Sequence, residues 1–390
     1  MSQPTPRLMW MDANLVPVAP IAHVFNLTLD ISATGRSSFS ASIGVDDFSQ
    51  SYMAYQHFIG VAFSGGDFIR TDQYVFLAQG ATVNLTEGTV EISGLDPAVL
   101  LQNVTPSLKV TGERTPYFSK GRFTISTASG NDIVEEFNRA LNDHITYLAA
   151  NVWTGSSAPV VWEQLRTGFS GKLVADGTAV HDYEAVEFFP KWQNIIIANG
   201  GVIVPSASVN AGEFSYMIFK PSESGVYITQ DMLTGKTSMS IDNSDRVDAV
   251  NVVAYDKDSS GGTSLTVHRL SGTSPDYDST LRYGATTLDA SNLEDKTPGG
   301  IMNALRSEGL SYLNDHKGYQ TYEVPLPANL YGGAFADVQN RISLGSIVHV
   351  RTSLFTVDLP VIEAKEVWKS SGHSVTITCG TARPSNLSIR

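Results

Sequence analysis

Cysteine is almost absent from this sequence: Cys379 is the only one among 390 residues. A disulfide within one chain is therefore impossible. Because disulfides commonly reinforce proteins of oxidising compartments, we expect this chain to fold in a reducing cytoplasm. Residues 1–20 lack a basic start and an uninterrupted apolar stretch, which predicts that no signal peptide precedes the fold. No run reaches the roughly 18 apolar residues that cross a bilayer, so we expect no membrane-spanning segment.

Positive charge is also scarce. The chain has 26 Lys and Arg residues against 39 Asp and Glu residues, and its formal net charge is −13. The basic residues are scattered and form no Lys/Arg-rich run. A protein that holds DNA or RNA needs a basic face that displaces counterions from the phosphates. The charge balance therefore argues against a lasting complex with nucleic acid.

The motifs that mark catalytic, cofactor and metal sites are missing as well. The sequence contains no HExxH, HxH or Cys/His cluster, no GxSxG or SxxK, and neither GxGxxG nor GxxxxGK[ST]. The sequence therefore predicts no catalytic residue, no metal ligand and no cofactor. The eight histidines are scattered singly: His23, His57, His144, His181, His268, His316, His349 and His373.

Several local patterns resemble sites but are better explained without one. The Asp-rich residues 242–248 and 256–262 lack the 12-residue spacing of a calcium-binding EF-hand, and we interpret them as solvated turns. GGDF at 65–68 lies among predicted strands, and Cys379 lies on the buried side of a strand. His144 falls on or beside the apolar stripe of a helix and is interpreted as a packed or half-exposed side chain. The fifteen Tyr and five Trp could stack on sugars, but their spread favours core and interface positions.

The first third of the chain is predicted to be β-structure. One strand is indicated by apolar residues that alternate with polar ones, namely Phe25, Leu27, Leu29 and Ile31. Residues 32–39 predict a turn, with Gly35 free to take a positive φ, and then a new strand. Further strands are predicted over 74–77, 81–86 and 89–95, with 86–89 as a hairpin turn.

The middle of the chain alternates helices and strands. The clearest helix follows a cap at Ser129 or Asn131, and its apolar positions are Ile133, Phe137, Leu141, Ile145 and Leu148. A shorter helix is predicted over about 161–168. A third helix starts after Pro190, carries Trp192, Ile195 and Ile196, and stops at Asn199, Gly200 and Gly201. Strands over 202–205 and 214–220 complete an α/β unit.

The last third is predicted to return to β-structure around one helix at about 301–317. A strand at 247–256 precedes a Gly/Ser/Thr/Asp-rich region, 257–298, that holds a further strand at 265–270. The final strand places Val375, Ile377 and Cys379 on one face. Strands are expected after the helix at 320–326, 347–351, 354–368 and 373–380.

Four segments, in this order, carry a resemblance to a known family. They are FNLTLDISATGRSSFSASI (25–43), HDYEAVEFFPKWQNIIIANGGVIV (181–204), PGGIMNALRSEGLSYLNDHKGYQTYEVPLP (298–327) and NRISLGSIVHVRTSLFTVDLPVIEAKEVWKSSGHSVTITCGTARP (340–384). They are similar to the first hairpin, the aromatic-bearing middle helix, the helix before the second barrel and the second barrel of the tail-hub, or baseplate hub, family of long-tailed phages. The chain departs from that pattern at Ser346, where Asp is frequent, and at Cys379-Gly380, which replaces an apolar–Gly pair.

The resemblance implies an α+β, mainly β fold, with two β-barrel-like domains bracketing α/β segments and three copies assembling as a ring. It also implies a short form of the hub that carries no C-terminal hydrolase or fibre extension. The expected units are a first barrel at 1–126, an α/β domain at 127–240, a second barrel from 241–258 with 322–387, and an inserted α+β segment at 259–321.

The function that the resemblance implies is structural. Such a hub lies at the tail tip of the virion, is made and assembled in the cytoplasm of the bacterial host, closes the distal end of the tail tube and opens for DNA ejection. Its implied partners are its own copies in a homotrimer, a distal tail protein, a tape-measure protein and receptor-binding or fibre proteins. DNA passes only in transit, and an acidic channel lining would suit that passage because it repels the phosphates.

Two other classes of function stay open at this stage. A carbohydrate-binding or adhesin module of the tail tip would carry exposed clusters of aromatic side chains. A cell-wall hydrolase would need two carboxylates that face each other across a cleft, and spacing alone does not exclude such a pair among 39 acidic residues.

Overall fold

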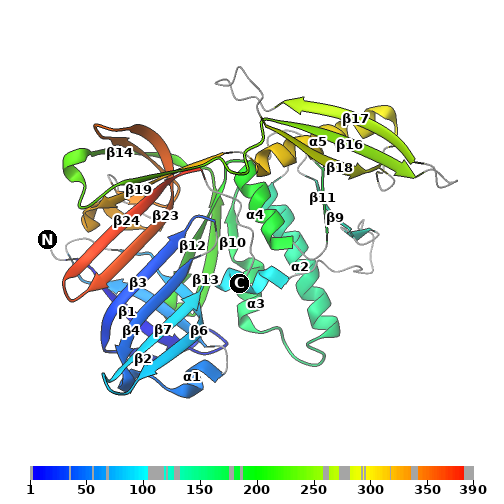
Figure 1. The fold of residues 1–390 in the computed structure, drawn as a ribbon. Helices are drawn as coiled ribbons and strands as arrows, with labels where there is room; N and C mark the ends of the chain where they lie inside the picture. The colour runs from blue at the N-terminus through cyan, green and yellow to red at the C-terminus, as the bar shows by residue number, and fades with distance from the viewer. Residues whose placement is uncertain are drawn as a thin grey trace.

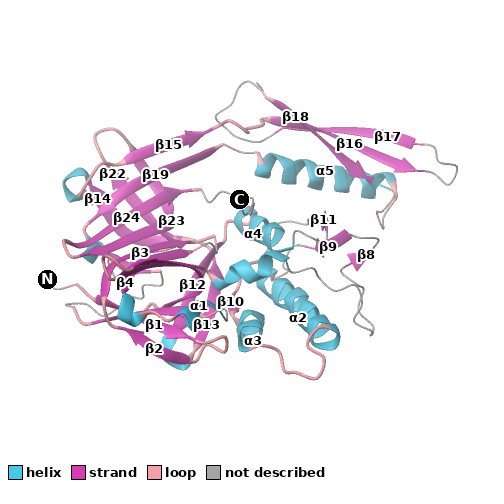
Figure 2. Ribbon diagram, turned by 60° about the horizontal axis from the view of Figure 1, so that its bottom comes forward, coloured by secondary structure: helices cyan, strands magenta, loops and turns pink. Residues whose placement is uncertain are grey.

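The computed structural model gives the chain an α+β, mainly β fold, as the sequence predicted (Figures 1 and 2). No helix in the described part of the chain is both long and apolar enough to cross a membrane. The structure describes residues 3–34, 37–54, 57–66, 70–103, 118–119, 122–126, 132–174, 180–184, 188–257, 263–271, 282–290, 293, 296–316, 318–334 and 341–381.

A thirteen-stranded sheet dominates the molecule and takes its strands from both ends of the chain. Eleven of its strands follow one another in a single linear order, called here the main path, and two strands branch from it. Of these two, β14 (Ser222–Thr229) pairs with β22 (Ser346–Arg351), and β22 pairs with β23 of the main path. A short helix, α1 (Gln50–Ala54), precedes β5. Along the main path the strands lie in the order β15 (Ser238–Asp242), β19 (Tyr319–Leu326), β24 (Gly372–Gly380), β23 (Thr356–Lys369), β3 (Val24–Ser32), β4 (Ser38–Gly44), β7 (Thr89–Leu95), β6 (Tyr74–Asn84), β5 (Phe58–Ser64), β1 (Thr5–Met11) and β2 (Pro17–Ile21).

The two halves of this sheet meet where β3 pairs antiparallel with β23. Figure 1 shows the result: the blue strand β3 from the N-terminal part lies beside the orange-red strands β23 and β24 from the C-terminal part. Leu27, Leu29 and Ile31 alternate along β3 as predicted, and all three are fully buried in the main core. Phe25 was expected to lie on the same face, but it is 54% exposed, because the register with β4 shifts between Val24 and Asn26.

Other strands also match the predicted pattern closely. The strands expected at 74–77 and 81–86 are one strand, β6, with a bulge between Ala78 and Gly80. The hairpin to β7 forms as predicted, with Gly88 at a φ of 66°. In β24, Val375, Ile377 and Cys379 are buried together in the core. The turn glycine expected at Gly35 lies outside the described residues.

The α/β unit packs three helices against a small sheet and forms a second core. Its helix α2 (Ile133–Asn151) begins at Asp132, whose carboxylate accepts the Val134 amide hydrogen at 3.0 Å. The cap had been predicted at Ser129 or Asn131, which both lie outside the described residues. The other elements are α3 (Val160–Thr167), α4 (Phe188–Ala198), β10 (Phe169–Gly171), β12 (Val202–Ser208) and β13 (Glu213–Phe219).

The aromatic side chains of this second core stack around Phe137. The ring of Phe137 lies 5.0 Å from that of Trp192 on α4 and 4.4 Å from that of Phe169 on β10. The helix α4 starts at Phe188, three residues before the predicted start at Lys191, so that Pro190 lies in its first turn, where a missing amide hydrogen costs little. It ends as predicted, before Gly200 at a φ of 73°.

A separate three-stranded sheet projects beside these two cores. The strand β16 (Ala249–Lys257) pairs antiparallel with β17 (Thr263–Ser271) and parallel with β18 (Tyr283–Asp289), and α5 (Pro298–Asp315) lies along the sheet (Figure 2). Residues 241–258 were expected in the second barrel, but only β15 joins the large sheet there, while β16 belongs to this projecting sheet. The remaining small strands are β8 (Phe118–Ser119), β9 (Arg122–Ser126), β11 (Val180–Glu184), β20 (Tyr331–Gly333) and β21 (Ile342–Ser343).

The central position of β3 gives a first testable prediction. The substitution Leu29→Ala removes a fully buried side chain from the strand that joins the two halves. We expect a loss of about 2–5 kcal/mol in the free energy of unfolding, because a cavity stays where the side chain was. Chemical denaturation followed by tryptophan fluorescence measures the loss. Thr28→Ala, on the opposite face of the same strand, is the control, and equal losses for both variants would contradict this account of the joint.

Candidate functional site

The structure does not bring the histidines into one site. Among the described residues, no three of His, Cys, Asp and Glu lie where they could hold a metal ion. Burial raises the pKa of the Cys379 thiol to about 12, so this thiol stays protonated and unreactive. Six histidine side chains each make a different contact: His23 with Asp47, His57 with Tyr52, His144 with Trp162, His316 with Tyr312, His349 with Asp358 and Glu223, and His373 with Glu366.

The Asp-rich segment at 242–248 forms a turn, as interpreted from the sequence. The Ser244 amide and hydroxyl both donate to the Asp242 carboxylate, at 3.0 and 2.6 Å. Arg246 and Asp248 then form an ion pair at 3.0 Å. The segment 256–262 and the Asp and Phe of GGDF lie largely outside the described residues.

The most unusual group of polar side chains is a buried charged cluster around Arg70. This residue lies in the connection from β5 to β6, and its side chain has no exposed surface. Its guanidinium binds Asp72 through Nε at 2.9 Å and Nη2 at 2.6 Å. It also binds Glu366 of β23 through Nη1 at 2.5 Å and Nη2 at 2.9 Å, across 296 positions of sequence. Two bidentate carboxylates thus clamp one arginine between the two halves of the chain.

Further hydrogen bonds complete this cluster. The Tyr74 hydroxyl donates to Asp72 at 2.5 Å and accepts the Ala334 amide hydrogen at 3.1 Å. His373 Nε2 lies 3.1 Å from Glu366 Oε2. Beside it, Gly333 has a φ of +112°, and a Cβ there would lie 2.4 Å from the Asp72 carboxyl carbon, so only glycine fits.

Aromatic rings exclude water from the Arg70 cluster. The guanidinium carbon lies 3.7 Å from the centre of the Phe63 ring and 5.9 Å from that of Trp368, both within the range of cation–π attraction. The His373 ring stacks on Trp368 at 4.1 Å. Burial alone would raise the pKa of Glu366, but Arg70 and His373 outweigh it and hold that pKa below its ordinary value. Closed to solvent on all sides, the cluster joins the two halves and offers no surface to a substrate.

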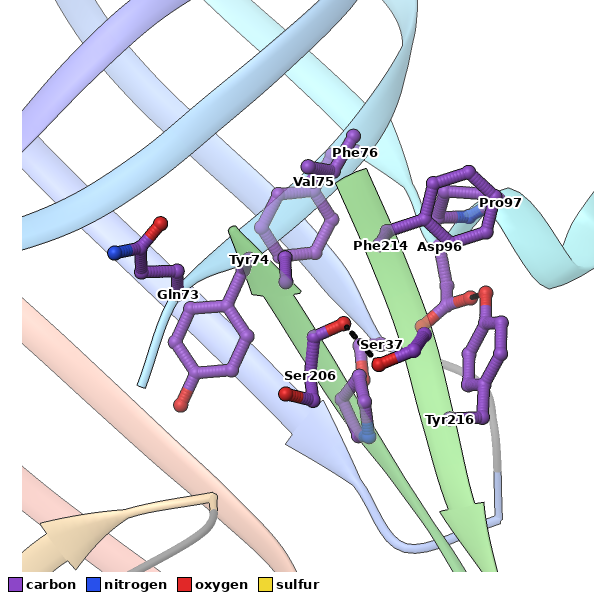
Figure 3. Close-up of a pocket in the computed structure, with 13 residues that line it drawn as sticks. Ser37, Gln73, Tyr74, Val75, Phe76, Asp96, Pro97, Ser206, Phe214 and Tyr216 are labelled. Carbon is purple, nitrogen blue, oxygen red and sulfur yellow. Dashed lines mark hydrogen bonds between the residues drawn. The ribbon is translucent and has the colours of Figure 1, made fainter. Parts of the chain in front are cut away.

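A second buried carboxyl lies where the large sheet meets the α/β unit. Asp96 follows β7, and it accepts hydrogen bonds from the Tyr216 hydroxyl of β13 and from the Ala98 amide at 2.8 Å. It lines a small pocket that also includes Ser37, Gln73 and Ser206, and Figure 3 shows the Tyr216 hydroxyl against the Asp96 carboxyl. Burial raises the pKa of Asp96 to about 7, although both hydrogen bonds favour the ionised form.

Sequence reasoning missed both of these buried groups. A signal for the Arg70 cluster is present at Glu366, which takes an inward position of β23 between Ala364 and Trp368, where an apolar residue is expected. The partner could not be found in the same way, because Arg70 and Asp72 lie in a connection without a periodic pattern. A charged residue on the buried face of a strand predicts a partner but does not identify it.

The Arg70 cluster yields a prediction for stability. Replacing Arg70→Met leaves the Asp72 and Glu366 carboxylates buried without their positive partner. We expect the free energy of unfolding to fall by about 3–5 kcal/mol, the usual result of breaking a buried ion pair. Denaturant titration measures the loss. Arg7→Met, at an exposed position on β1, is the matched control, and a loss for Arg70→Met no larger than for this control would refute the role given to the cluster.

Asp96 yields a prediction for pH dependence. Its folded pKa of about 7 lies above the ordinary value of 3.8, so folding disfavours the ionised form. Below about pH 4 the carboxyl is protonated in both the folded and the unfolded state, and its ionisation takes nothing from the free energy of unfolding. As the pH rises from 4 to about 7, the free energy of unfolding falls by up to about 1.4 kcal/mol per pH unit, and above pH 7 the loss stays constant.

The variant Asp96→Asn cannot ionise and keeps an oxygen that accepts both hydrogen bonds. We therefore expect the stability of the natural protein, relative to Asp96→Asn, to decline between pH 4 and 7. Urea unfolding of both proteins across that range measures the difference. Glu91→Gln, at an exposed position on β7, should leave the profile of the natural protein unchanged. A difference between natural protein and Asp96→Asn that does not vary with pH would show that the buried carboxyl is not titrating.

Comparison with known proteins adds the context for this geometry. No protein-family model and no curated protein sequence matches the chain. Among solved structures, a tail protein from Neisseria meningitidis MC58 aligns with a TM-score of 0.53 and 12% sequence identity, covering 96% of each chain. The 43 kDa tail protein of prophage MuSo2 from Shewanella oneidensis aligns with a TM-score of 0.52 and 11% identity, over 97% of this chain and 99% of that one. Over nearly its whole length, the chain therefore has the fold of phage tail proteins, as its resemblance to the tail-hub family implied.

Proposed function

We propose that this chain is a structural hub subunit at the tip of a phage tail, and that it has no catalytic role. The observation that carries the proposal is the eight-stranded run from β15 to β6, in which both halves of the chain share one antiparallel sheet. One face of this run covers the main core, and the other carries hydroxyl and charged side chains. Residues of this second face, called here the open face, include Thr28, Asp30, Ser40, Glu91, Ser93, Glu323, Glu363, Lys365, Thr376 and Thr378.

The chemistry of the open face suits a channel through which DNA passes. Four of its residues are acidic, Asp30, Glu91, Glu323 and Glu363, and Lys365 stands among them. Short hydroxyl side chains offer no flexible cations to hold a phosphate backbone, and the excess of acids repels it. Such a surface fits DNA in transit and agrees with the low basic content of the whole chain.

The two barrel-like halves would serve assembly. Three copies in a ring, each with a first barrel at residues 1–126 and a second that includes 322–387, would present six similar units. Such a ring could match a six-fold tail tube, closing its distal end, docking to a distal tail protein and capping the tape-measure protein. Its other side would hold receptor-binding or fibre proteins and open for ejection. An obligate ring of this kind is expected to bury more than ~2,000 Å² at each interface.

The location of the chain in the particle tests this proposal. Antibody raised against the recombinant protein is applied to particles from the source culture and detected by immunogold electron microscopy. We expect gold only at the distal tip of the tails. Antibody absorbed beforehand with the recombinant protein is the control. Gold along the tail, on the head, or nowhere despite a positive blot of the same particles would overturn the hub function.

A further inference from the structure

The free edges of the large sheet differ in how they are protected. The strand β2 ends the main path and carries Pro17 and Pro20, which cannot donate to another strand. Proline on an edge strand is a common means of preventing unwanted pairing. At the opposite end, β15 has the sequence SMSID and contains neither proline nor a basic residue. Its pairing in the described part of the structure is with β19 alone.

The exposed side chains of β15 continue the two faces of the sheet. Met239 and Ile241 are 53% and 54% exposed, although they lie on the core face, where Met239 is opposite the buried Tyr322. Ser238 and Ser240 lie on the open face, opposite Glu323 and Thr321 of β19. An apolar core face that ends uncovered at an unprotected edge is the feature expected where another strand adds to a sheet.

A second unprotected edge lies on the distal half of β6. The strand β5 pairs with β6 only from Tyr74 to Leu77, and beyond the bulge at Ala78 the pairing of β6 in the described residues is with β7 alone. Residues 81–84 are all exposed, and Val83 is 45% exposed. This stretch, ATVN, carries no charge and no proline. The nearby helix α1 contacts β6 and packs its Tyr52 and Met53 against the core side of the sheet.

These two edges complement each other in register and in face. If Ser240 of β15 lies opposite Thr82 of β6 in an antiparallel pair, Met239 meets Val83 and Ile241 meets Ala81. Each of these four residues lies on the core face of its own sheet, where Val83 is opposite Val90 and Ala81 opposite Ile92. On the open face, Ser238 meets Asn84.

We propose that β15 of one copy pairs antiparallel with residues 80–84 of β6 in a second copy of this chain, in the register Ser240 opposite Thr82. The inference rests on the proposed function in one respect, that copies of the chain assemble as a ring. It specifies which edges meet and which residues face each other, and it selects a second copy over a different tail protein because both complementary edges belong to this chain.

The order of strands explains why this contact would repeat and close. The run β15-β19-β24-β23-β3-β4-β7-β6 has eight strands, and each neighbouring pair is antiparallel. Because the number is even, β6 runs opposite to β15, so the next copy continues the alternation. The contact joins two different surfaces and is therefore heterologous, the type that generates rings. The bulk of each core lies on one face, which puts the open face toward the inside of the ring.

Charge placed on the two edges tests the pairing. In Met239→Lys and in Val83→Lys a charge would be buried against an apolar partner, whereas in the separate chain both positions are exposed. We expect each variant to stay folded and to need at least tenfold more protein for half-assembly than the natural chain. Combining Met239→Lys with Val83→Glu should restore assembly. Val18→Lys, at a 48% exposed position on β2, is the matched control and should assemble normally. Sedimentation velocity measures the mass, and circular dichroism verifies the fold.

A cross-link then tests the register. A chain with Met239→Cys is mixed with a chain with Val83→Cys and oxidised by oxygen with a copper–phenanthroline catalyst. Opposite cysteines of an antiparallel pair lie within the Cα separation of 4.4–6.8 Å that a disulfide spans. We expect a covalent dimer from the mixture, and none from either chain alone, because Cys379 is buried.

The outcomes separate this pairing from the hub function. If the natural chain forms a ring that neither lysine variant weakens, or if the cysteine mixture gives no dimer within a formed ring, the proposed edge pairing is wrong, while tip labelling can still support the hub. If the edges pair as proposed but the tail tips stay unlabelled, the pairing stands and the hub function falls. Binding of these edges to a different tail protein, with no self-association at any concentration, would also overturn the pairing.

Discussion

The structure depends on the pairing of β3 with β23, which holds residues from the two ends of the chain in one sheet. Without it, β3 would present a free edge on one side and β23 would lose one of its neighbours. The buried Arg70 cluster crosses the same boundary, because Arg70 and Asp72 belong to the N-terminal half and Glu366 to the C-terminal half. A buried ion cluster adds little net stability compared with apolar packing, but it tolerates few alternative geometries. Apolar burial thus holds the halves together, and the charged cluster fixes how they meet.

This arrangement has a consequence for folding. Contacts between residues nearly 300 positions apart form only after the whole chain is available, and such long-range pairings are slow. During synthesis the N-terminal strands emerge first, and the edge of β3 stays unpaired until β23 has been made. Before β23 pairs with β3, the open face of β3 and β4 is already polar, because it carries Ser and Thr side chains together with Asp30. The polar side chains that suit the open face to the proposed channel lining therefore also limit aggregation before the sheet is complete.

Much of the fold could be predicted from the sequence because local patterns report burial. The alternation along residues 25–31 predicted β3, and the three-to-four spacing after residue 132 predicted α2. Two strands were missed because neither shows a clean alternation: β5 begins with four consecutive buried residues, and β1 contains Pro6. The position of β16 was also wrong, since a strand's own pattern does not state which sheet it joins. Register, bulges and partners depend on contacts between distant segments, and the exposure of Phe25 is an example.

The candidate functional features were harder to predict than the fold, for a physical reason. Catalytic and metal sites concentrate rare residue types at fixed spacing, which a sequence displays directly. The edges that we propose for assembly instead use common residues, namely Met, Ile, Val, Ala, Ser and Thr, on β15 and on the distal half of β6. What distinguishes β15 and the distal half of β6 is the absence of the proline that protects β2, and that absence becomes informative only when the sheet order shows which strands lie at an edge. In such a protein, the position and protection of the edge strands therefore indicate function as much as the chemistry of the side chains does.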